Sequence, residues 1–216
     1  MNEIIKFGIG FLAGRPNVCN IINSCYKDIL EQGQKSGKEV KFTIFILFDL
    51  EYQHTNRINF YNIKPDVYKN IEIKYITPED IEEEKKILRS RYNISKPDIY
   101  LILGSGYAKA RNSIMYFALK RKMDYLMFWD DDEYPIANIK NENGEIEWEK
   151  QDNILQHLKY IENADLTMGY RCGNMSPIPY IEYDNKLEEE DFKNYIDGVS
   201  NEAISWEKIK NRDSNN

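Results

Sequence analysis

The chain has 216 residues, of which 42% are hydrophobic and 13% aromatic, with a formal net charge of −7 and a pI of about 5.1. This length suits one sizeable α/β domain, or a domain with a short appendage. The acidic balance argues against binding a nucleic-acid backbone through bulk charge, so a small anionic ligand would require local cations or a metal.

The first predicted unit is a short core strand, Lys6–Phe11, followed by a turn-rich loop that contains Ala13, Gly14 and Arg15. A helix should come next, because apolar residues recur with helical spacing on one face: Val18, Ile21, Ile22, Cys25 and Ile29. Asn17 is a suitable N-cap, and Gly33 lies near the expected end of the helix. Arg15 is either a surface cation at a helix start or a ligand contact.

A second, nearly continuous apolar strand is expected at Lys41–Phe48, and it ends at Asp49. The alternation of Ile71–Ile76 predicts a half-exposed strand. Thr77 and Asp80 then form a capping pattern around Pro78, which predicts a helix that runs to about residue 91. The many charged residues of this helix indicate a solvated face.

Another apolar run, Ile99–Leu103, ends in the loop Gly104–Gly106, and a helix should follow from about Ala108 to Lys122. Lys109 and Arg111 fall in its first turn, where the helix dipole disfavours cations. This conflict indicates either an anionic ligand nearby or pairing of Arg111 with a neighbouring carboxylate, and both can hold.

The most informative stretch is the apolar run Tyr125–Trp129, which has the length of one buried strand and stops at Asp130, Asp131 and Asp132. In open α/β sheets the ligand crevice lies outside the carboxyl ends of the strands. Three adjacent carboxylates repel one another, and a hard divalent ion such as Mg²⁺ or Mn²⁺ removes that repulsion. The alternative is that the triplet is a solvated turn or a cap for the next segment.

Beyond the triplet we expect a hairpin at Ile136–Trp148 that turns at Asn143 and Gly144, a helix at Asn153–Ile161 and a short strand at Asp165–Met168. Ser176–Tyr183 contains two prolines and should be extended. We predict one domain over residues 1–185, followed by a charged, helical and partly disordered tail over residues 186–216.

Three cysteines, Cys19, Cys25 and Cys172, do not make a disulfide framework, so we expect a reducing, cytoplasmic compartment. With two histidines besides, no zinc site has plausible spacing. The sequence contains neither a signal-peptide pattern nor an apolar run of the roughly 18–20 residues that span a membrane. We expect no membrane span, while peripheral membrane association stays open.

Three of these motifs together resemble the nucleotide-sugar glycosyltransferases of the GT-A fold, close to glycosyltransferase family 2. They are the opening strand with its Gly14-Arg15-Pro16 loop, the Gly106–Asn112 segment before a helix, and the apolar strand that ends in an Asp-x-Asp motif. Their order and spacing agree with the family over roughly residues 6–173. The resemblance implies a Rossmann-like, three-layer α/β/α domain with a mostly parallel central sheet.

The resemblance also implies a role for each matching residue. Ala13, Gly14 and Arg15 would border the base and ribose of a nucleotide diphospho-sugar, Asp49 would face the base edge, and Arg111 would lie beside the nucleotide. Asp130 and Asp132 would be the catalytic pair that holds Mn²⁺ or Mg²⁺, with Asp130 also near the ribose, which fits a strand because residues two apart point the same way. Asp131, in the nucleotide-sugar site, would point away from them or support them. The implied activity is transfer of a sugar, with a UDP-sugar favoured, to a hydroxyl acceptor with inversion.

The chain departs from the family after Asp132, where the acceptor half is short or missing and neither a Glu-Asp base motif nor a processive Gln-x-x-Arg-Trp motif is evident. Candidate bases are Glu182, Asp184 and Asp197. The acceptor, whether saccharide, lipid-linked or protein, is not identified. Two other hypotheses stay open: a Mg²⁺-dependent nucleotidyltransferase, and a non-catalytic GT-A remnant that binds nucleotide.

Overall fold

The computed structural model describes residues 4–52, 55–169, 190–191 and 193–194. The chain divides into two compact units, residues 1–172 and residues 173–216, and the fold presented below is that of the first unit. Several predictions fall outside the described residues and stay predictions: the domain boundary after residue 185, the extended segment Ser176–Tyr183, and the candidate bases Glu182, Asp184 and Asp197.

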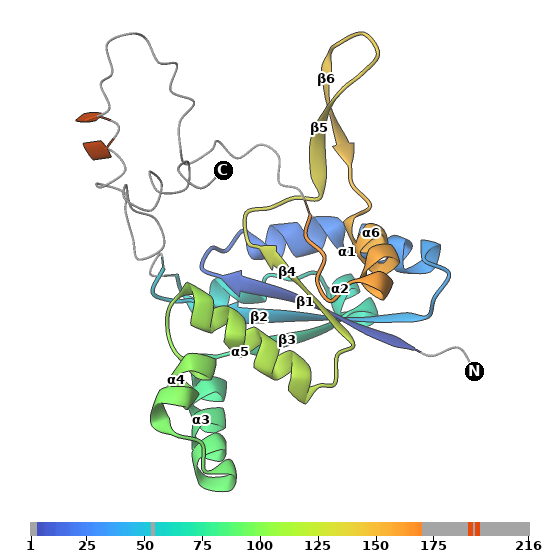
Figure 1. Cartoon of the computed structure of the whole chain (residues 1–216). Coiled ribbons are helices and arrows are strands. Elements are labelled where there is room, and N and C mark those ends of the chain that lie inside the picture. Colours follow the sequence, from blue (N-terminus) through green and yellow to red (C-terminus); the bar gives the residue numbers. More distant parts are fainter. Residues whose placement is uncertain (1–3, 53–54, 170–189, 192, 195–216) are drawn as a thin grey trace. The chain divides into compact units, whose positions relative to one another are not determined.

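A sheet of four parallel strands forms the centre of this unit, in the order β3-β2-β1-β4 (Figure 1). The strands are β1 (Ile5–Ala13), β2 (Val40–Phe48), β3 (Glu72–Ile76) and β4 (Tyr125–Asp130). The chain builds outward from β1 to β3 and then returns to the other side of β1. The sheet therefore has a topological switch point between β1 and β4, the place where open α/β sheets bind ligands.

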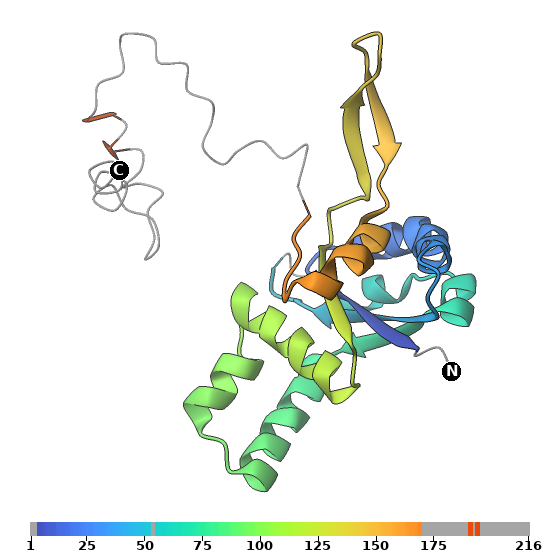
Figure 2. The same ribbon diagram turned by 45° about the vertical axis from the view of Figure 1, so that its right-hand side comes forward.

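Helices cover both faces of the sheet (Figures 1 and 2). One core cluster joins the sheet to α1 (Val18–Lys35), α2 (Pro65–Asn70) and α6 (Asn153–Tyr160). The other joins it to α3 (Pro78–Tyr92), α4 (Lys96–Leu103) and α5 (Tyr107–Lys120). Burial on two faces explains why β1 and β2 read as continuous apolar runs. The expected Rossmann-like, three-layer α/β/α architecture with a parallel sheet is confirmed.

Close backbone packing positions α5 over the centre of the sheet. A Cβ atom on Gly10 of β1 would lie 2.6 Å from Cγ2 of Ile114, which is fully buried on α5. The absence of a side chain at Gly10 therefore lets α5 approach β1 closely. This close contact helps to place the first turn of α5 beside the carboxyl end of the sheet.

Several local predictions are confirmed. Thr77 and Asp80 form both hydrogen bonds of a capping box at the start of α3. The hairpin consists of β5 (Ile136–Lys140) and β6 (Ile146–Lys150), and Gly144 in its turn has a φ of +81°, a conformation that glycine adopts without strain. Two short 3₁₀ segments, η1 (Arg57–Tyr61) and η2 (Ile161–Asn163), complete the elements of the described region.

Other local expectations need correction. Asp165–Met168 is not a strand: Leu166 and Met168 are 83% and 92% exposed, and no described strand pairs with the segment. The apolar run Ile99–Leu103, for which the sequence predicts no particular element, belongs to helix α4, which begins where the Ser95 side chain accepts a hydrogen bond from the Asp98 backbone. Asn17 occupies the N-cap position of α1 without a side-chain cap bond, because its backbone is already helical (φ −59°, ψ −22°) and its Oδ1 accepts from the Tyr134 hydroxyl at 3.3 Å instead.

Candidate functional site

The predicted site residues meet at the switch point, from segments that are far apart in the sequence. Leu12 near the end of β1 lies opposite Asp130 at the end of β4. The backbone N–H of Asp49 donates to the carbonyl of Ala13 at 3.0 Å, which brings the end of β2 to the same edge. Thus the loop after β1, the end of β2 and the aspartate triplet are adjacent, as the sequence predicts for strands that end at one edge of a parallel sheet.

The Asp131 side chain connects the loop after β1 to the end of β4 at this edge of the sheet. Its Oδ2 accepts hydrogen bonds from the backbone N–H groups of Gly14 at 2.9 Å and Arg15 at 2.8 Å, and its Oδ1 accepts one from Arg15 Nη1 at 2.6 Å. The side chain is only 7% exposed. A buried carboxylate with three donors, one of them charged, is a strong and directional contact. Asp131 therefore fixes the loop after β1 to the end of β4.

Arg15 lies between two members of the triplet. Its Nη1 is 2.6 Å from Asp131 Oδ1 and 2.7 Å from Asp132 Oδ2, while its Nη2 donates to the Tyr52 hydroxyl at 3.0 Å. The guanidinium carbon is 5.2 Å from the centre of the Tyr52 ring. Burial lowers the pKa of Arg15, but Asp131, Tyr52 and Asp132 together raise it above its usual value. Arg15 is thus a fixed positive charge in the site.

Arg111 is the second cation of the site. From the second turn of α5, its Nη2 donates to Asp130 Oδ1 at 2.8 Å and also to the Tyr107 hydroxyl. Its guanidinium carbon is 4.6 Å from the centre of the Tyr107 ring and 5.3 Å from that of Phe128. The expectation that Arg111 pairs with a member of the triplet is confirmed.

The two guanidinium groups change how the negative charge of the three aspartates is balanced. The sequence suggested a divalent ion as the means of relieving repulsion between the three carboxylates, yet Arg15 and Arg111 lie between them and neutralise much of their charge. The argument from strand alternation does not extend to Asp132 either, because β4 ends at Asp130 and the next two residues form a turn. Asp131 and Asp132 share Arg15, whereas Asp130 pairs with Arg111.

The fit of Mg²⁺ or Mn²⁺ depends on Asp130 and Asp132. Asp132 is 55% exposed and Asp130 is 21% exposed, so both carboxylates are more accessible to solvent than Asp131, which is 7% exposed. In the described part of the chain, no group of three or more His, Cys, Asp or Glu side chains has a metal-holding arrangement. One or two carboxylates are what Mg²⁺ usually takes from a protein when phosphates complete its shell. Asp130 and Asp132, each paired with an arginine, do not complete a metal site by themselves, and a metal there would need further oxygen atoms from a ligand.

The remaining wall of the site comes from the loop after β2. Tyr52 covers Gly14 so closely that a Cβ atom there would lie 2.7 Å from Cδ1 of the ring. Thr55 donates from its hydroxyl to the Gly14 carbonyl at 2.8 Å. Asp49 is half-buried beside this loop, and no hydrogen bond from the described residues reaches its carboxylate.

No protein-family model matches the chain, and no curated protein sequence is significantly similar to it. The fold itself is a generic α/β arrangement, so the family resemblance noted in the sequence is not established by it.

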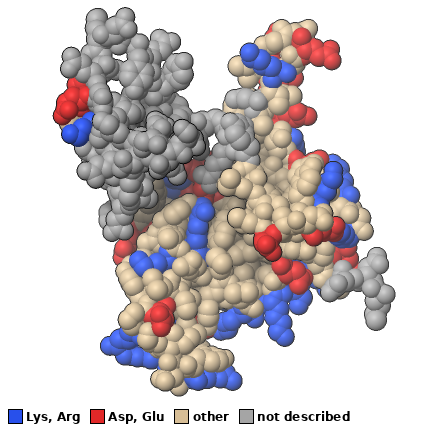
Figure 3. Space-filling view, viewed as in Figure 1, with Lys and Arg blue, Asp and Glu red and all other residues tan. Residues whose placement is uncertain are grey.

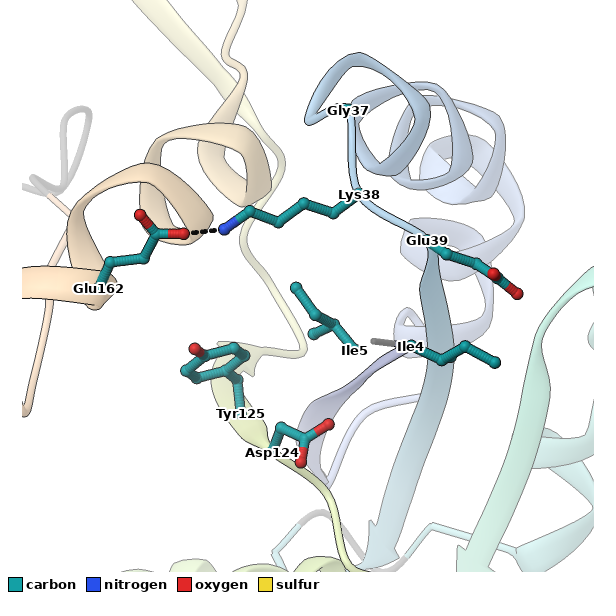
Figure 4. Close-up of a pocket in the computed structure, with 8 residues that line it drawn as sticks. All are labelled: Ile4, Ile5, Gly37, Lys38, Glu39, Asp124, Tyr125 and Glu162. Atoms are coloured by element: carbon teal, nitrogen blue, oxygen red, sulfur yellow. Dashed lines mark hydrogen bonds and ion pairs between the residues drawn. The ribbon is translucent and has the colours of Figure 1, made fainter. Parts of the chain in front are cut away.

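A depression lies at the opposite, amino end of the sheet (Figure 4). Its volume is about 500 Å³, and Lys38 and Glu162 form an ion pair across it. Asp124 accepts a hydrogen bond from the backbone N–H of Lys6 at 2.7 Å. The strand-end rule for parallel sheets favours the carboxyl end instead, and none of the predicted site residues lines this pocket.

Sequence reasoning missed three residues of the site: Tyr52, Thr55 and Tyr107. Tyr52 and Tyr107 are 57% and 59% exposed, and each stacks on one of the two arginines. Only an indirect signal for the tyrosines was present in the sequence: they occur in polar segments that could lie near an arginine. The other predicted cation of α5, Lys109, is not brought into the site, because its ammonium lies 4.5 Å from the centre of the Tyr100 ring on α4.

Proposed function

We propose that the protein is a glycosyltransferase of the GT-A type that binds a nucleotide diphospho-sugar together with Mn²⁺ or Mg²⁺. The observation that carries this proposal is the pairing of Arg15 with Asp131 and Asp132, and of Arg111 with Asp130, at the switch point between β1 and β4. Two guanidinium groups flank two accessible carboxylates there. This combination matches a diphosphate, which offers oxygens to both cations and to a metal.

Different residues of the site would bind different parts of the nucleotide diphospho-sugar. The guanidinium groups of Arg15 and Arg111 would hold the phosphate oxygens, and Asp49 would accept hydrogen bonds from the base edge. The exposed rings of Tyr52 and Tyr107 offer stacking surfaces on either side. A metal held by Asp130 and Asp132 would stabilise the negative charge that develops on the leaving diphosphate. Asp131 keeps the loop of Gly14 and Arg15 in place throughout.

Calorimetry with UDP, GDP and CDP, each with and without Mn²⁺, tests the proposal. We expect binding of one nucleotide that depends on the metal and favours UDP. The variant Arg111→Ala should lose at least about tenfold in affinity, because it removes a charge-assisted contact. Lys109→Ala is the matched control from the same end of the helix, and its affinity should not change. Absence of metal-dependent binding to all three nucleotides would refute the proposal.

A second candidate, nucleotide binding without turnover, is favoured by the ion pairing of all three aspartates with arginine. Release of nucleoside diphosphate from a panel of donor sugars, with and without sugar acceptors, separates the two. We expect slow hydrolysis, and little transfer to simple sugars if the acceptor half is incomplete. Binding without any release of nucleoside diphosphate would favour the non-catalytic candidate. Release of pyrophosphate from a nucleoside triphosphate would favour a nucleotidyltransferase.

A further inference from the structure

The second half of α3, the turn after it and most of α4 form a strongly basic segment, residues 85–101, which we name the basic hairpin. It contains five basic residues and one acidic residue, a net charge of +4 in a chain whose net charge is −7. Figure 3 shows Lys and Arg side chains gathered over the end of the molecule where Figure 1 places α3 and α4. The first half of α3 is acidic instead, with Glu79, Asp80, Glu82, Glu83 and Glu84, so the positive charge is confined to the part of the two helices around the turn that joins them.

The cations of the basic hairpin are mostly exposed and unneutralised. Lys85 pairs with Glu82 at 2.7 Å. Among the described residues, no carboxylate forms an ion pair with the other four, which are Lys86, Arg89, Arg91 and Lys96, all of them exposed.

Large apolar and aromatic side chains are interspersed with these cations. Tyr92, Tyr100 and Leu101 are 58%, 51% and 58% exposed. Leu88 and Ile99 instead face inward and pack into the core cluster with α5, so the fold of the hairpin does not require the exposed three. The helix dipole explains Arg89 and Arg91 in the last turn of α3, but it opposes a lysine at position 96 in the first turn of α4.

We propose that the basic hairpin docks on an anionic phospholipid surface. Exposed cations attract acidic headgroups, and tyrosine and leucine side chains beside them can enter the interfacial region of the bilayer. The exposed Leu101 and Tyr92 beside the cations favour a bilayer over a nucleic acid, because the bilayer offers an apolar region that these side chains can enter. The proposal is independent of the nucleotide site, and the surface involved is separate from Arg15 and Arg111.

Sedimentation with vesicles tests the proposal. The full chain is mixed with vesicles of phosphatidylcholine alone, or with about 30% phosphatidylserine, at low and high salt. We expect binding only to the anionic vesicles, weakened by salt. The triple variant Lys86→Glu, Arg89→Glu, Arg91→Glu should partition onto them at least about a hundredfold less, given roughly fivefold per basic residue. Nucleotide affinity should not change.

The matched control reverses three exposed lysines outside the hairpin, Lys27→Glu, Lys140→Glu and Lys159→Glu, which changes the net charge equally. It should bind nearly as well as the parent chain. A second variant, Tyr92→Ser with Leu101→Ser, leaves the charge intact and should bind roughly tenfold less, which separates lipid insertion from simple charge attraction. Failure of the parent chain to bind anionic vesicles, equal loss in the triple variant and its control, or tighter binding to an RNA oligomer than to the vesicles would overturn the proposal.

Discussion

The two ends of the parallel sheet both carry ion pairs, but these pairs are of different kinds. At the amino end, Lys38 and Glu162 have side chains that are 36% and 52% exposed, and they meet across an open pocket. At the carboxyl end, Asp131 is 7% exposed and accepts two backbone N–H groups besides the Arg15 guanidinium. Solvent screens the first pair, while the second is desolvated and tied to the main chain.

This difference shows that the number of charged residues at a sheet end says little about what they do. Water could solvate the charged groups of Lys38 and Glu162 about as well as they stabilise each other. The carboxyl-end cluster brings together the ends of β1 and β4 and the start of α5, and it holds their relative positions. A site that must keep several strands in register needs the second kind of contact.

The largest effect should come from the buried carboxylate. Asp131→Asn keeps the size of the side chain but turns an amide N–H₂ group toward Arg15 or toward the backbone donors of Gly14. We expect a loss of about 3 kcal/mol in the free energy of unfolding, because the buried backbone N–H groups of Gly14 and Arg15 lose a charged acceptor and a donor of the amide faces another donor. Glu162→Gln at the amino end should change it by less than about 1 kcal/mol. Denaturant unfolding of both variants measures the contrast, and equal losses would contradict it.

A smaller change in stability, but a large change in binding, is expected for Asp132→Ala. This side chain is 55% exposed, so loss of its ion pair with Arg15 should alter the free energy of unfolding by no more than about 1 kcal/mol. Metal-dependent nucleotide binding should disappear, because one of the two accessible carboxylates is gone. Thermal melting and calorimetry on the same sample test this. A variant that unfolds, or that binds nucleotide and Mn²⁺ normally, would show that Asp132 is structural.

The smallest effect concerns His157 on α6, the helix that leads into Glu162 and the amino-end pocket. Burial lowers the pKa of His157 below its usual value, and Thr167 lies 2.8 Å from its Nδ1. The unfolded chain therefore binds the proton more readily than the folded one. Stability should be full above about pH 6.5 and fall by a few tenths of a kcal/mol as the pH drops toward the folded pKa. His157→Gln should remove this slope, measured by unfolding from pH 7.5 to 5.

Periodicity was enough to predict the layers of the fold. The continuous apolar runs of β1 and β2 and the stripe on α1 report burial directly, and burial decides those elements. The run Ile99–Leu103 shows the limit, because five apolar residues fit a strand or a helix equally well. The deciding signal was upstream, in the cap formed by Ser95 and Asp98. For Asp165–Met168, an apolar alternation had no described strand to pair with.

The site was predictable in its location but not in its internal pairing. The strand-end rule placed Gly14, Asp49 and the aspartate triplet together, which the structure confirms. Which of the three aspartates is buried depends on where β4 ends and on how the following turn bends. Neither follows from residue types, because three consecutive aspartates are indistinguishable in the sequence. The stacking of Tyr52 on Arg15 is likewise a tertiary contact with no local pattern.

No helix in the described part of the chain has the length and apolar character needed to cross a bilayer. The proposed docking of the basic hairpin requires none, since an interfacial contact depends on exposed charge and a few apolar side chains. The predicted cytoplasmic location stays a prediction.

The strand order also has a consequence for how the protein is made. Asp131 and Gly14 are separated by 117 positions, yet they share a hydrogen bond. During synthesis, β1, β2 and β3 leave the ribosome before β4 and can pair first, with one side of β1 still open. Closing so long a loop is slow, and the open strand side is prone to aggregation until β4 arrives. Assembly of the site should therefore be among the last folding events, so that nucleotide binding would report completed folding of this unit.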